Sequence, residues 1–543
     1  MSALLRRALG GCVVLAGATH GAYAQAQDDA ATFEARAVAA PERGAGAASL
    51  DADDARNSGG AAGEPALALA NLPGVARAGL ASGELVIWGS PPADTRVYVD
   101  GIELPALFHP GGFRTTIHPA LLSRLTLTPG APGPALGGGL GGVVELETRD
   151  LDTEASHAAV DVTTMDSAAL LHASLGPARA AWGVRVGYFD RLEPLLAPRS
   201  TAIVPLPAYA DGIAKAEVDL GGRAQLTALW LGSHDRVVRG VEAVDPGSSR
   251  TQAQSRDLQL GYLRYSRAFD DGARIVLTPF VATHAHAESD RSGTVPWDLD
   301  VRELRYGLRA GYAMLTEAFD VRLGVDSSAV RSEIGRTGSL TLPPREGDVV
   351  VFGQPPGSGV SSDHFTTYDA NVAPHAELTA RFGRFVLSPG FRLDVHALSS
   401  SRARPTVAST PPIGFSDLQA RPEPRVGLRY LVNDWLSGDA RAGLTHQVAA
   451  PEDRSAVFGN PALGLARAWT LAAGPRARLL ALVDVEATAF YKTLARLPAR
   501  NPTQPVPLAQ GLLARGTGDA YGAELLVRLR AWHGLSGQLG YTL

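Results

Sequence analysis

The chain has 543 residues with a hydrophobic content of 45%, so it is long enough for several domains or one large β architecture, and it lacks the polar bias of a disordered protein. Its net charge is -5 and its basic residues are scattered, whereas a protein that binds nucleic acid concentrates positive charge on one face. Nucleic acid is therefore not an expected partner.

The N-terminus has the pattern of a secretory signal peptide. Arg6-Arg7 form a positive segment, an apolar run covers residues 8–18, and Ala22-Tyr23-Ala24 is a cleavage motif. A lipoprotein signal around Cys12 is disfavoured because the apolar run continues beyond the cysteine instead of preceding it. We expect residues 1–24 to be removed on export. Because Cys12 is the only cysteine, the mature chain would have no disulfide and no thiolate metal site.

Residues 25–63 are polar and rich in alanine and glycine, which predicts a flexible extension. Within it, residues 33–40 (FEARAVAA) alternate in a way that suits an edge strand added to the sheet of a partner. An alanine-rich linker with accidental alternation is the open alternative, because the run is short.

A small module is expected at residues 64–149. Its first segment, EPALALANLPGV, has apolar residues at helical spacing and ends at Pro73-Gly74, which predicts a short helix. Asp100-Gly101 predicts a tight hairpin turn of type I′, with positive φ at both residues. Short runs rich in branched and aromatic residues predict strands at 84–88, 96–99, 102–104, 121–127 and 143–148. The module is therefore a mixed α/β domain.

Two features of this module could suggest a ligand site. The glycine cluster at residues 137–142 is followed by VVELET, which favours a strand over a nucleotide-binding helix, and no Gly-Lys-Ser/Thr sequence follows it. His109 lies in a Pro/Gly loop, where a ligand contact is open but a solvated side chain is the simpler interpretation. No second ligand stands near His109 at metal spacing, so no metal site is expected.

From residue 150 onward, the sequence predicts a transmembrane antiparallel β-barrel. Segments of about ten residues alternate between side chains suited to lipid and to water, and aromatic residues favour their ends. Short turns such as 221–222 alternate with long polar loops such as 233–256 and 332–364. A soluble solenoid or propeller would show a fixed repeat, and none is present. No apolar run after the leader is long enough for a transmembrane helix.

The expected barrel has about sixteen or seventeen strands, although single-chain bacterial barrels have an even number. The final residues, LGYTL, have the pattern of the middle of a strand. We therefore expect that this sequence is cut short and lacks the last barrel strands, or that the barrel is incomplete in this form.

Histidine and serine patterns indicate no catalytic centre. His284 and His286 lie on one face of a predicted strand, where a polar pair lining the lumen is favoured over a metal pair because a third ligand is missing. No Ser/His/Asp spacing supports a hydrolase, although residues of such a triad need not be close in sequence.

The module and the strands after it resemble TonB-dependent outer-membrane receptors. The resemblance is specific over residues 71–149, where it is carried by NLPGVAR, ELVIWGS, TRVYVDGIELPALFHPGGF and IHPALLSRLTLTPGAPGPALGGGLGGVVELETR. It continues in FGNPALGLARAWTLAAG, ATAFYKTL and GTGDAYGAELLVRLR. It implies a plug domain at residues 64–149 inside a barrel of the 22-stranded type at residues 150–543. About 17 of those strands would be present here.

The resemblance also implies positions for two functional segments. A TonB box, which pairs with the periplasmic partner, would consist of Phe33, Glu34, Ala35, Arg36, Ala37, Val38, Ala39 and Ala40, although it lacks the usual Thr-Val-Val core. The loop at the apex of the plug, which faces the substrate in the family, would contain Leu107, Phe108, His109, Gly111, Gly112, Phe113 and Arg114. Before Gly89 the family usually has an arginine that binds the plug to the barrel wall. Trp88 stands there in this chain, so other contacts must retain the plug.

The expected function is import, with no catalytic residues, cofactor or bound metal. A scarce extracellular ligand, such as an iron chelate or cobalamin, would bind the outer side, and a TonB-type protein in the periplasm would supply the energy. The protein would be a monomeric barrel in the lipid of the outer membrane of a Gram-negative-type bacterium. A non-transporting surface receptor or sensor, and a plugged porin-like structural barrel, are the open alternatives. The ligand itself depends on loops that one sequence does not decode.

Overall fold

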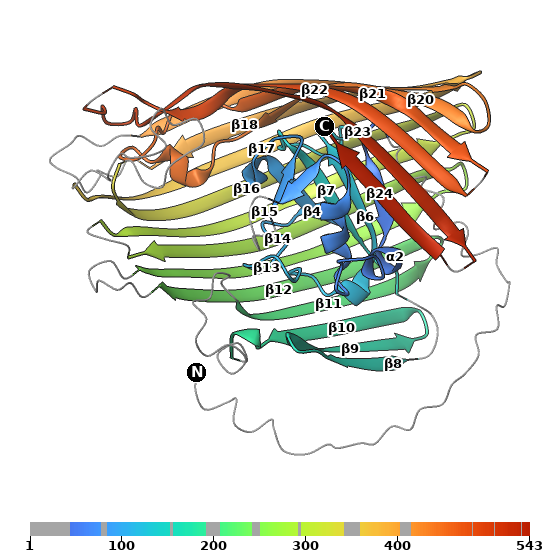
Figure 1. Ribbon diagram of the computed structural model, residues 1–543, viewed down its shortest axis with the longest axis horizontal. Coiled ribbons are helices and arrows are strands. Elements are labelled where there is room, and N and C mark those ends of the chain that lie inside the picture. Colours follow the sequence, from blue (N-terminus) through green and yellow to red (C-terminus); the bar gives the residue numbers. More distant parts are fainter. Residues whose placement is uncertain are drawn as a thin grey trace, which may run out of the picture. The chain divides into compact units, whose positions relative to one another are not determined.

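The computed structural model describes residues 44–77, 84–151, 156–191, 207–241, 250–291, 295–340, 359–401, 414–480, 482–503, 505–533 and 535–543, which belong to one structural unit. A small five-stranded sheet lies within the curve of a large antiparallel sheet that has the strand order of a barrel (Figure 1). None of the described helices is long and apolar enough to cross a membrane.

The small sheet has the order β1-β6-β7-β4-β5, with β4 and β7 parallel and the other pairs antiparallel. Its strands are β1 (Ala48–Asp51), β4 (Thr95–Val99), β5 (Ile102–Glu103), β6 (Leu122–Pro129) and β7 (Gly142–Thr148). A separate pair is formed by β2 (Val75–Arg77) and β3 (Leu85–Ile87). The helical elements are α2 (Ala52–Arg56) and the 3-10 helices Pro65–Asn71, Pro92–Asp94 and Pro119–Leu121.

The local predictions for this module are confirmed. Strands form in all five predicted runs, and the segment predicted as a short helix forms the 3-10 helix Pro65–Asn71. Asp100 and Gly101 have φ angles of 50° and 83°, as a type I′ turn requires. The turn joins β4 to β5 through the pair Val99 and Ile102. The glycine cluster leads directly into β7, so it forms no phosphate-binding helix start.

The polar extension predicted to reach residue 63 is shorter than expected. β1 pairs with β6, and the Asp51 carboxylate caps α2 by accepting the backbone N–H of Asp53 at 2.9 Å. Ala52 and Ala55 are buried against the small sheet. Alanines fill this contact, so the segment folds without the larger apolar residues on which the sequence interpretation relied.

Seventeen consecutive strands form the large sheet, in agreement with the predicted number. They are β8 (His157–Val162), β9 (Asp166–Leu175), β10 (Ala178–Gly187), β11 (Ala208–Gly221), β12 (Ala224–Val241), β13 (Arg250–Ala268), β14 (Ala273–Asp290), β15 (Trp297–Leu315), β16 (Phe319–Gly338), β17 (Ser361–Phe382), β18 (Phe385–Ser400), β19 (Phe415–Leu431), β20 (Leu436–Gln447), β21 (Ala466–Leu479), β22 (Val483–Arg500), β23 (Leu512–Trp532) and β24 (Leu535–Thr542). The ring order places β24 beside β8, and every side chain of these two strands is exposed. Backbone registers are found between the other neighbours in the order.

Many of the strands are longer than the segments of about ten residues that the sequence predicted. β12 and β13 have 18 and 19 residues, and β17 has 22. Much of the predicted loops 233–256 and 332–364 is therefore strand. The outer face of these ends carries many polar residues, so the alternation that marks a lipid-facing strand is lost there, while Ile334 and Phe365 belong to a buried apolar cluster.

Candidate functional site: the plug and its contacts with the barrel

Trp88 of the plug is inserted into the barrel wall. It is 2% exposed, and its ring stacks on Phe490 of β22 with the ring centroids 4.2 Å apart. Its indole N–H donates a hydrogen bond to the Glu524 carboxylate of β23, and the Arg441 guanidinium lies 5.4 Å from the ring centroid. Trp88 stands where the family usually has an arginine. In this chain the position also anchors the plug to the wall, but through an aromatic side chain.

His109 of the predicted apical loop is enclosed by the wall. Its Nδ1 lies 2.5 Å from Asp235 of β12 and its Nε2 lies 3.0 Å from Asp211 of β11, while its ring stacks on Tyr209. Burial by itself would lower the pKa of His109, but the two carboxylates raise it to about 9. The imidazole therefore carries a positive charge at neutral pH and holds the loop against β11 and β12.

Glu64 and Arg114 extend this charged contact to two further strands. Arg185 of β10 donates hydrogen bonds to Glu64 at 2.5 Å and to Asp211 at 3.0 Å. Arg114 donates to Asp166 of β9 at 2.6 Å. Each of these side chains is buried, so the contact is a desolvated ionic network in which each charge has a partner.

On the opposite side, arginines of the wall bind backbone carbonyls of the plug. The guanidinium of Arg425 on β19 donates to the carbonyls of Pro132, Gly133 and Leu136 at 2.9, 2.5 and 2.6 Å. Further carbonyls between residues 129 and 135 accept hydrogen bonds from Arg309, Arg392 and Arg441. The plug segment 129–136 is thus held by cations of four strands.

The hairpin turn of the plug contacts the wall between these two regions. Tyr262 of β13 donates to the Asp100 carboxylate at 2.6 Å, and Arg264 donates to the Asp100 carbonyl. Arg305 of β15 forms an ion pair with Glu103 of β5. The turn predicted from sequence therefore also positions polar groups that bind the barrel.

A cavity of about 430 Å³ lies between the plug and the wall. Its plug side includes Arg96, Tyr98 and Glu103, and its wall side is rich in charged groups. Burial and the Glu103 carboxylate raise the pKa of Tyr98 to about 12, so its hydroxyl is protonated and donates to the Gly137 carbonyl at 2.8 Å. The charged groups of the wall are Glu303, Arg305, Arg309, Asp326, Asp369, Arg392, Asp394, His396, Glu452 and Arg454.

The connection between β20 and β21 covers part of this cavity. It contains the 3-10 helix Pro451–Arg454, and residues 448–452 line the cavity. Ser455 donates a hydrogen bond to Asp363 of β17 at 2.6 Å, and the Arg336 guanidinium lies 4.3 Å from the ring centroid of Phe458. This connection is therefore packed into the lumen instead of extending away from the barrel.

The predicted site residues have different places in the structure. The TonB-box segment 33–40 lies outside the described residues. In the apical loop, Leu107, Phe108, Gly111 and Gly112 are buried like His109 and Arg114, whereas Phe113 is 37% exposed. His284 and His286 face the lumen and lie near Glu303 and Glu288, and no group of three metal-ligating side chains occurs among the described residues.

Sequence reasoning missed the wall arginines. A pattern that could have indicated them is the spacing of four in Arg305 and Arg309, and again in Arg421, Arg425 and Arg429. Residues an even number apart share one face of a strand, so these arginines had to line one side of the sheet. Their carbonyl partners in the plug have no such pattern.

Comparisons with known proteins agree with this architecture. The family model described as the TonB-dependent receptor plug domain matches residues 44–143, and the one described as the TonB-dependent receptor-like β-barrel matches residues 220–543. No match was found among curated protein sequences.

Several solved structures have the same fold. The ferric yersiniabactin uptake receptor FyuA from Yersinia pestis is 14% identical, with a TM-score of 0.69 over 92% of this chain and 78% of that chain. The siderophore receptor PiuA from Acinetobacter baumannii is 12% identical, with a TM-score of 0.65 over 91% and 78%. The copper transporter OprC is 13% identical, with a TM-score of 0.66 over 92% and 79%. At such low sequence identity, these matches establish a shared fold but do not identify the ligand of this chain.

The family matches cover most of the chain, and their order is the order of the plug and the barrel in the structure. This chain belongs to the TonB-dependent receptor family of the outer membrane, whose members are receptors and transporters and not enzymes.

Proposed function

We propose that this protein imports a small polar ligand, such as an iron chelate or cobalamin, across the outer membrane. The ligand binds in the cavity between the plug and the wall, and a TonB-type protein in the periplasm pulls on residues 33–40 to displace the plug. Residues 1–24 serve as the export signal. The protein acts as a monomer in outer-membrane lipid.

The nature of the plug–wall contact carries this proposal. Much of that contact consists of ion pairs and hydrogen bonds, such as those of His109, Glu103 and Arg425. Water can replace such partners, so that the net cost per hydrogen bond is about 1.5–3 kcal/mol where one partner is charged. A pulling force can therefore break the contacts one after another, which a continuous apolar contact would resist.

The charged lining of the cavity supports a polar ligand. Its guanidinium and carboxylate groups already form pairs, such as Arg309 with Asp326 at 2.8 Å and Arg392 with Asp394 at 3.0 Å. A ligand that carries both acidic and hydroxyl groups can exchange with these partners without leaving a buried charge unpaired. Phe113, the exposed side chain of the apical loop, does not line this cavity and is a separate proposed apolar contact for the ligand.

Uptake by living cells tests the role of the N-terminal segment. The deletion of residues 33–40 should abolish uptake of a labelled iron chelate or cobalamin by cells that depend on this protein. The deletion of residues 25–32 removes the same length of chain next to it and should leave uptake intact. Equal uptake with both deletions would contradict the assignment of residues 33–40 as the TonB box.

A further inference from the structure

Two histidines face each other across the first hairpin of the large sheet, which is formed by β8 and β9 (Figure 1). The register pairs His157 with His172, and their imidazole rings stack with the centroids 5.0 Å apart. The two residues are fifteen positions apart in the sequence, which matches no metal-binding motif. Only the pairing of the strands brings the two rings together.

The pair lies on the inner face of the sheet. His172 also pairs with Ala181 of β10, which is buried in the apolar cluster that the wall shares with the plug. The next residue along β10, Trp182, is 57% exposed and points the other way, because side chains alternate along a strand. Directly paired residues share a face, so His157 and His172 point toward the lumen.

His172 is buried without a polar partner. It is 5% exposed, and neither of its ring nitrogens has a hydrogen-bond partner among the described residues. A neutral imidazole has one N–H donor and one nitrogen lone pair, and the burial of either without a partner is unfavourable. Such a group in a native protein calls for an ion or a water molecule at its lone pair.

The second imidazole distinguishes a metal ion from a water molecule. Two imidazoles that bind one tetrahedral ion at about 2.0–2.1 Å have ring centroids about 5 Å apart, which is the separation of His157 and His172. Rotation of the rings about their side-chain bonds points one nitrogen of each at a common ion. A water molecule could satisfy His172 alone, without a histidine opposite it.

A second histidine pair on the inner face lacks this geometry. His284 and His286 of β14 have ring centroids 6.2 Å apart, which is more than one shared ion allows. His284 lies 3.6 Å from Glu303 and His286 lies 2.9 Å from Glu288, so one nitrogen of each ring has a carboxylate near it. These two histidines keep their interpretation as a polar part of the lumen lining.

The ligand set indicates the class of metal. Zn²⁺, Cu²⁺ and Ni²⁺ bind imidazole well, whereas Mg²⁺ and Ca²⁺ prefer oxygen ligands. His118 of the plug lies against Gly183 of β10, but its Nδ1 accepts the backbone N–H of Ala120, so its neutral ring has no free lone pair. No group of three ligating side chains occurs in the described part of the chain, so exchangeable ligands such as water fill the other positions.

The two histidines lie near the short-turn end of their strands. His172 is close to the end of β9 that leads into residues 176–177, whereas the far end of β10 leads into the long connection 188–207. In outer-membrane barrels the short turns are periplasmic. His157 begins the first strand after the plug, so an ion bound to both histidines fastens the start of the barrel to β9.

We propose that His157 and His172 form a binding site for one divalent ion of the zinc and copper class. The ion joins β8 to β9 on the periplasmic side of the lumen, beside the connection that leads from the plug. Metal binding at this site does not depend on the proposed import function, because it is a property of the wall alone.

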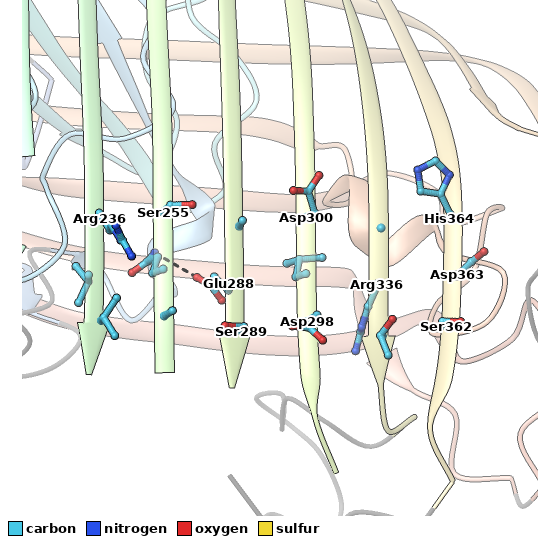
Figure 2. A pocket seen from close by; sticks show the side chains of 18 residues that line it. Arg236, Ser255, Glu288, Ser289, Asp298, Asp300, Arg336, Ser362, Asp363 and His364 are labelled. Carbon is cyan, nitrogen blue, oxygen red and sulfur yellow. Dashed lines mark hydrogen bonds between the residues drawn. The ribbon is translucent and has the colours of Figure 1, made fainter. Parts of the chain in front are cut away.

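Metal titration of the purified full chain in detergent tests the proposal. Calorimetry on metal-free protein should show one site for Zn²⁺ and Cu²⁺ that Mg²⁺ does not occupy. H157Q and H172Q each remove one ligand and should weaken this site roughly tenfold or more. H364Q is the matched control and should leave it unchanged. His364 is exposed on the outer face of β17, in a groove that no second described histidine lines (Figure 2).

Two further measurements keep the test valid if H172Q fails to fold. The electron paramagnetic resonance spectrum of bound Cu²⁺ should show coupling to two imidazole nitrogens in the wild type and to one in H157Q, which changes an exposed side chain. Zn²⁺ should slow amide hydrogen exchange in β8 and β9 of the wild type but not of H157Q. Equal metal affinity in the wild type and H157Q, or an equal loss in H157Q and H364Q, would overturn the proposal.

Discussion

The imidazole of His109 is the most tightly enclosed cation of the apical loop. Two wall carboxylates contact its two ring nitrogens, and all three side chains are buried. Sequence reasoning identified His109 as a candidate ligand contact because it lies in a Pro/Gly loop. The structure instead engages it with the wall, so its first role is to hold the plug.

H109Q should loosen the apical loop. The loss of one partner from a buried ion pair costs about 3–5 kcal/mol, so backbone amides of residues 107–116 should exchange hydrogen faster in the purified protein. H234Q, in an exposed pair with Asp257, is the matched control and should leave this exchange unchanged. Unchanged protection in H109Q would show that the ion pairs do not hold the loop.

The stabilisation by His109 should also depend on pH. Its pKa is raised to about 9 in the folded protein, against a value near 6.5 in the unfolded chain. A raised pKa means that the folded state binds the proton more tightly, so the contribution is complete below about pH 6.5 and is lost as the pH rises through about 9. The difference in exchange between the wild type and H109Q should therefore shrink over that interval. A constant difference would contradict a charged His109.

Trp88 is the second residue whose change should loosen the plug. W88A removes the stack on Phe490 and leaves the buried Glu524 without its indole donor, which should cost about 3–5 kcal/mol. The urea concentration at which the protein begins to conduct ions in a planar bilayer should therefore fall. W435A, which removes an exposed tryptophan, should leave that concentration unchanged. If W88A and W435A began to conduct at the same urea concentration, Trp88 would have no anchoring role.

At the scale of elements, the plug meets the wall in two chemically different sectors. Toward β10 to β14, apolar residues of the plug and the wall form a buried cluster that includes Ile213, Leu229 and Leu258, next to the buried ion pairs of His109. Toward β15 and β18 to β20, the segment 129–136 is held by arginines. Because water can replace hydrogen-bond partners but not apolar packing, the arginine sector should open first when the plug is pulled.

R425M tests this order of opening. It removes the contacts of one guanidinium nitrogen with three carbonyls; the two N–H groups of that nitrogen form hydrogen bonds worth about 1.5–3 kcal/mol each, because the donor is charged. Amides of residues 130–138 should lose protection while those near β6 keep theirs. R429M is the matched control, because Arg429 lies on the same face of β19 but pairs with Asp439 of the wall. Uniform loss of protection across the plug would contradict a separate sector.

At the scale of the whole molecule, the plug obstructs the lumen of the large sheet. Basic side chains of the wall contact the plug from β10 to β22. Arg185 of β10 binds Glu64, and Lys492 of β22 binds the Ile87 carbonyl. Few segments of the plug are free of such contacts, so the protein at rest should be a closed barrel.

Deletion of the plug should convert the protein into a pore. The full chain should show almost no ion conductance in a planar bilayer, whereas a variant without residues 25–149 should conduct. Urea should no longer change the conductance of this variant, because no plug is left to displace. A full chain that conducts as well as the deletion variant would support an open porin and contradict a plugged transporter.

Local patterns in the chain were enough to predict the strands, the Asp100-Gly101 turn and the plug-and-barrel family, because alternation, turn geometry and short motifs are properties of neighbouring residues. They failed where the outer face of a strand is mostly polar, as at the outer ends of β12 and β17. Contacts such as those of His109 with Asp211 and Asp235 join residues 102 and 126 positions apart. These depend on how the sheet curves around the plug, which brings distant charges together in a desolvated space that no short stretch of sequence encodes.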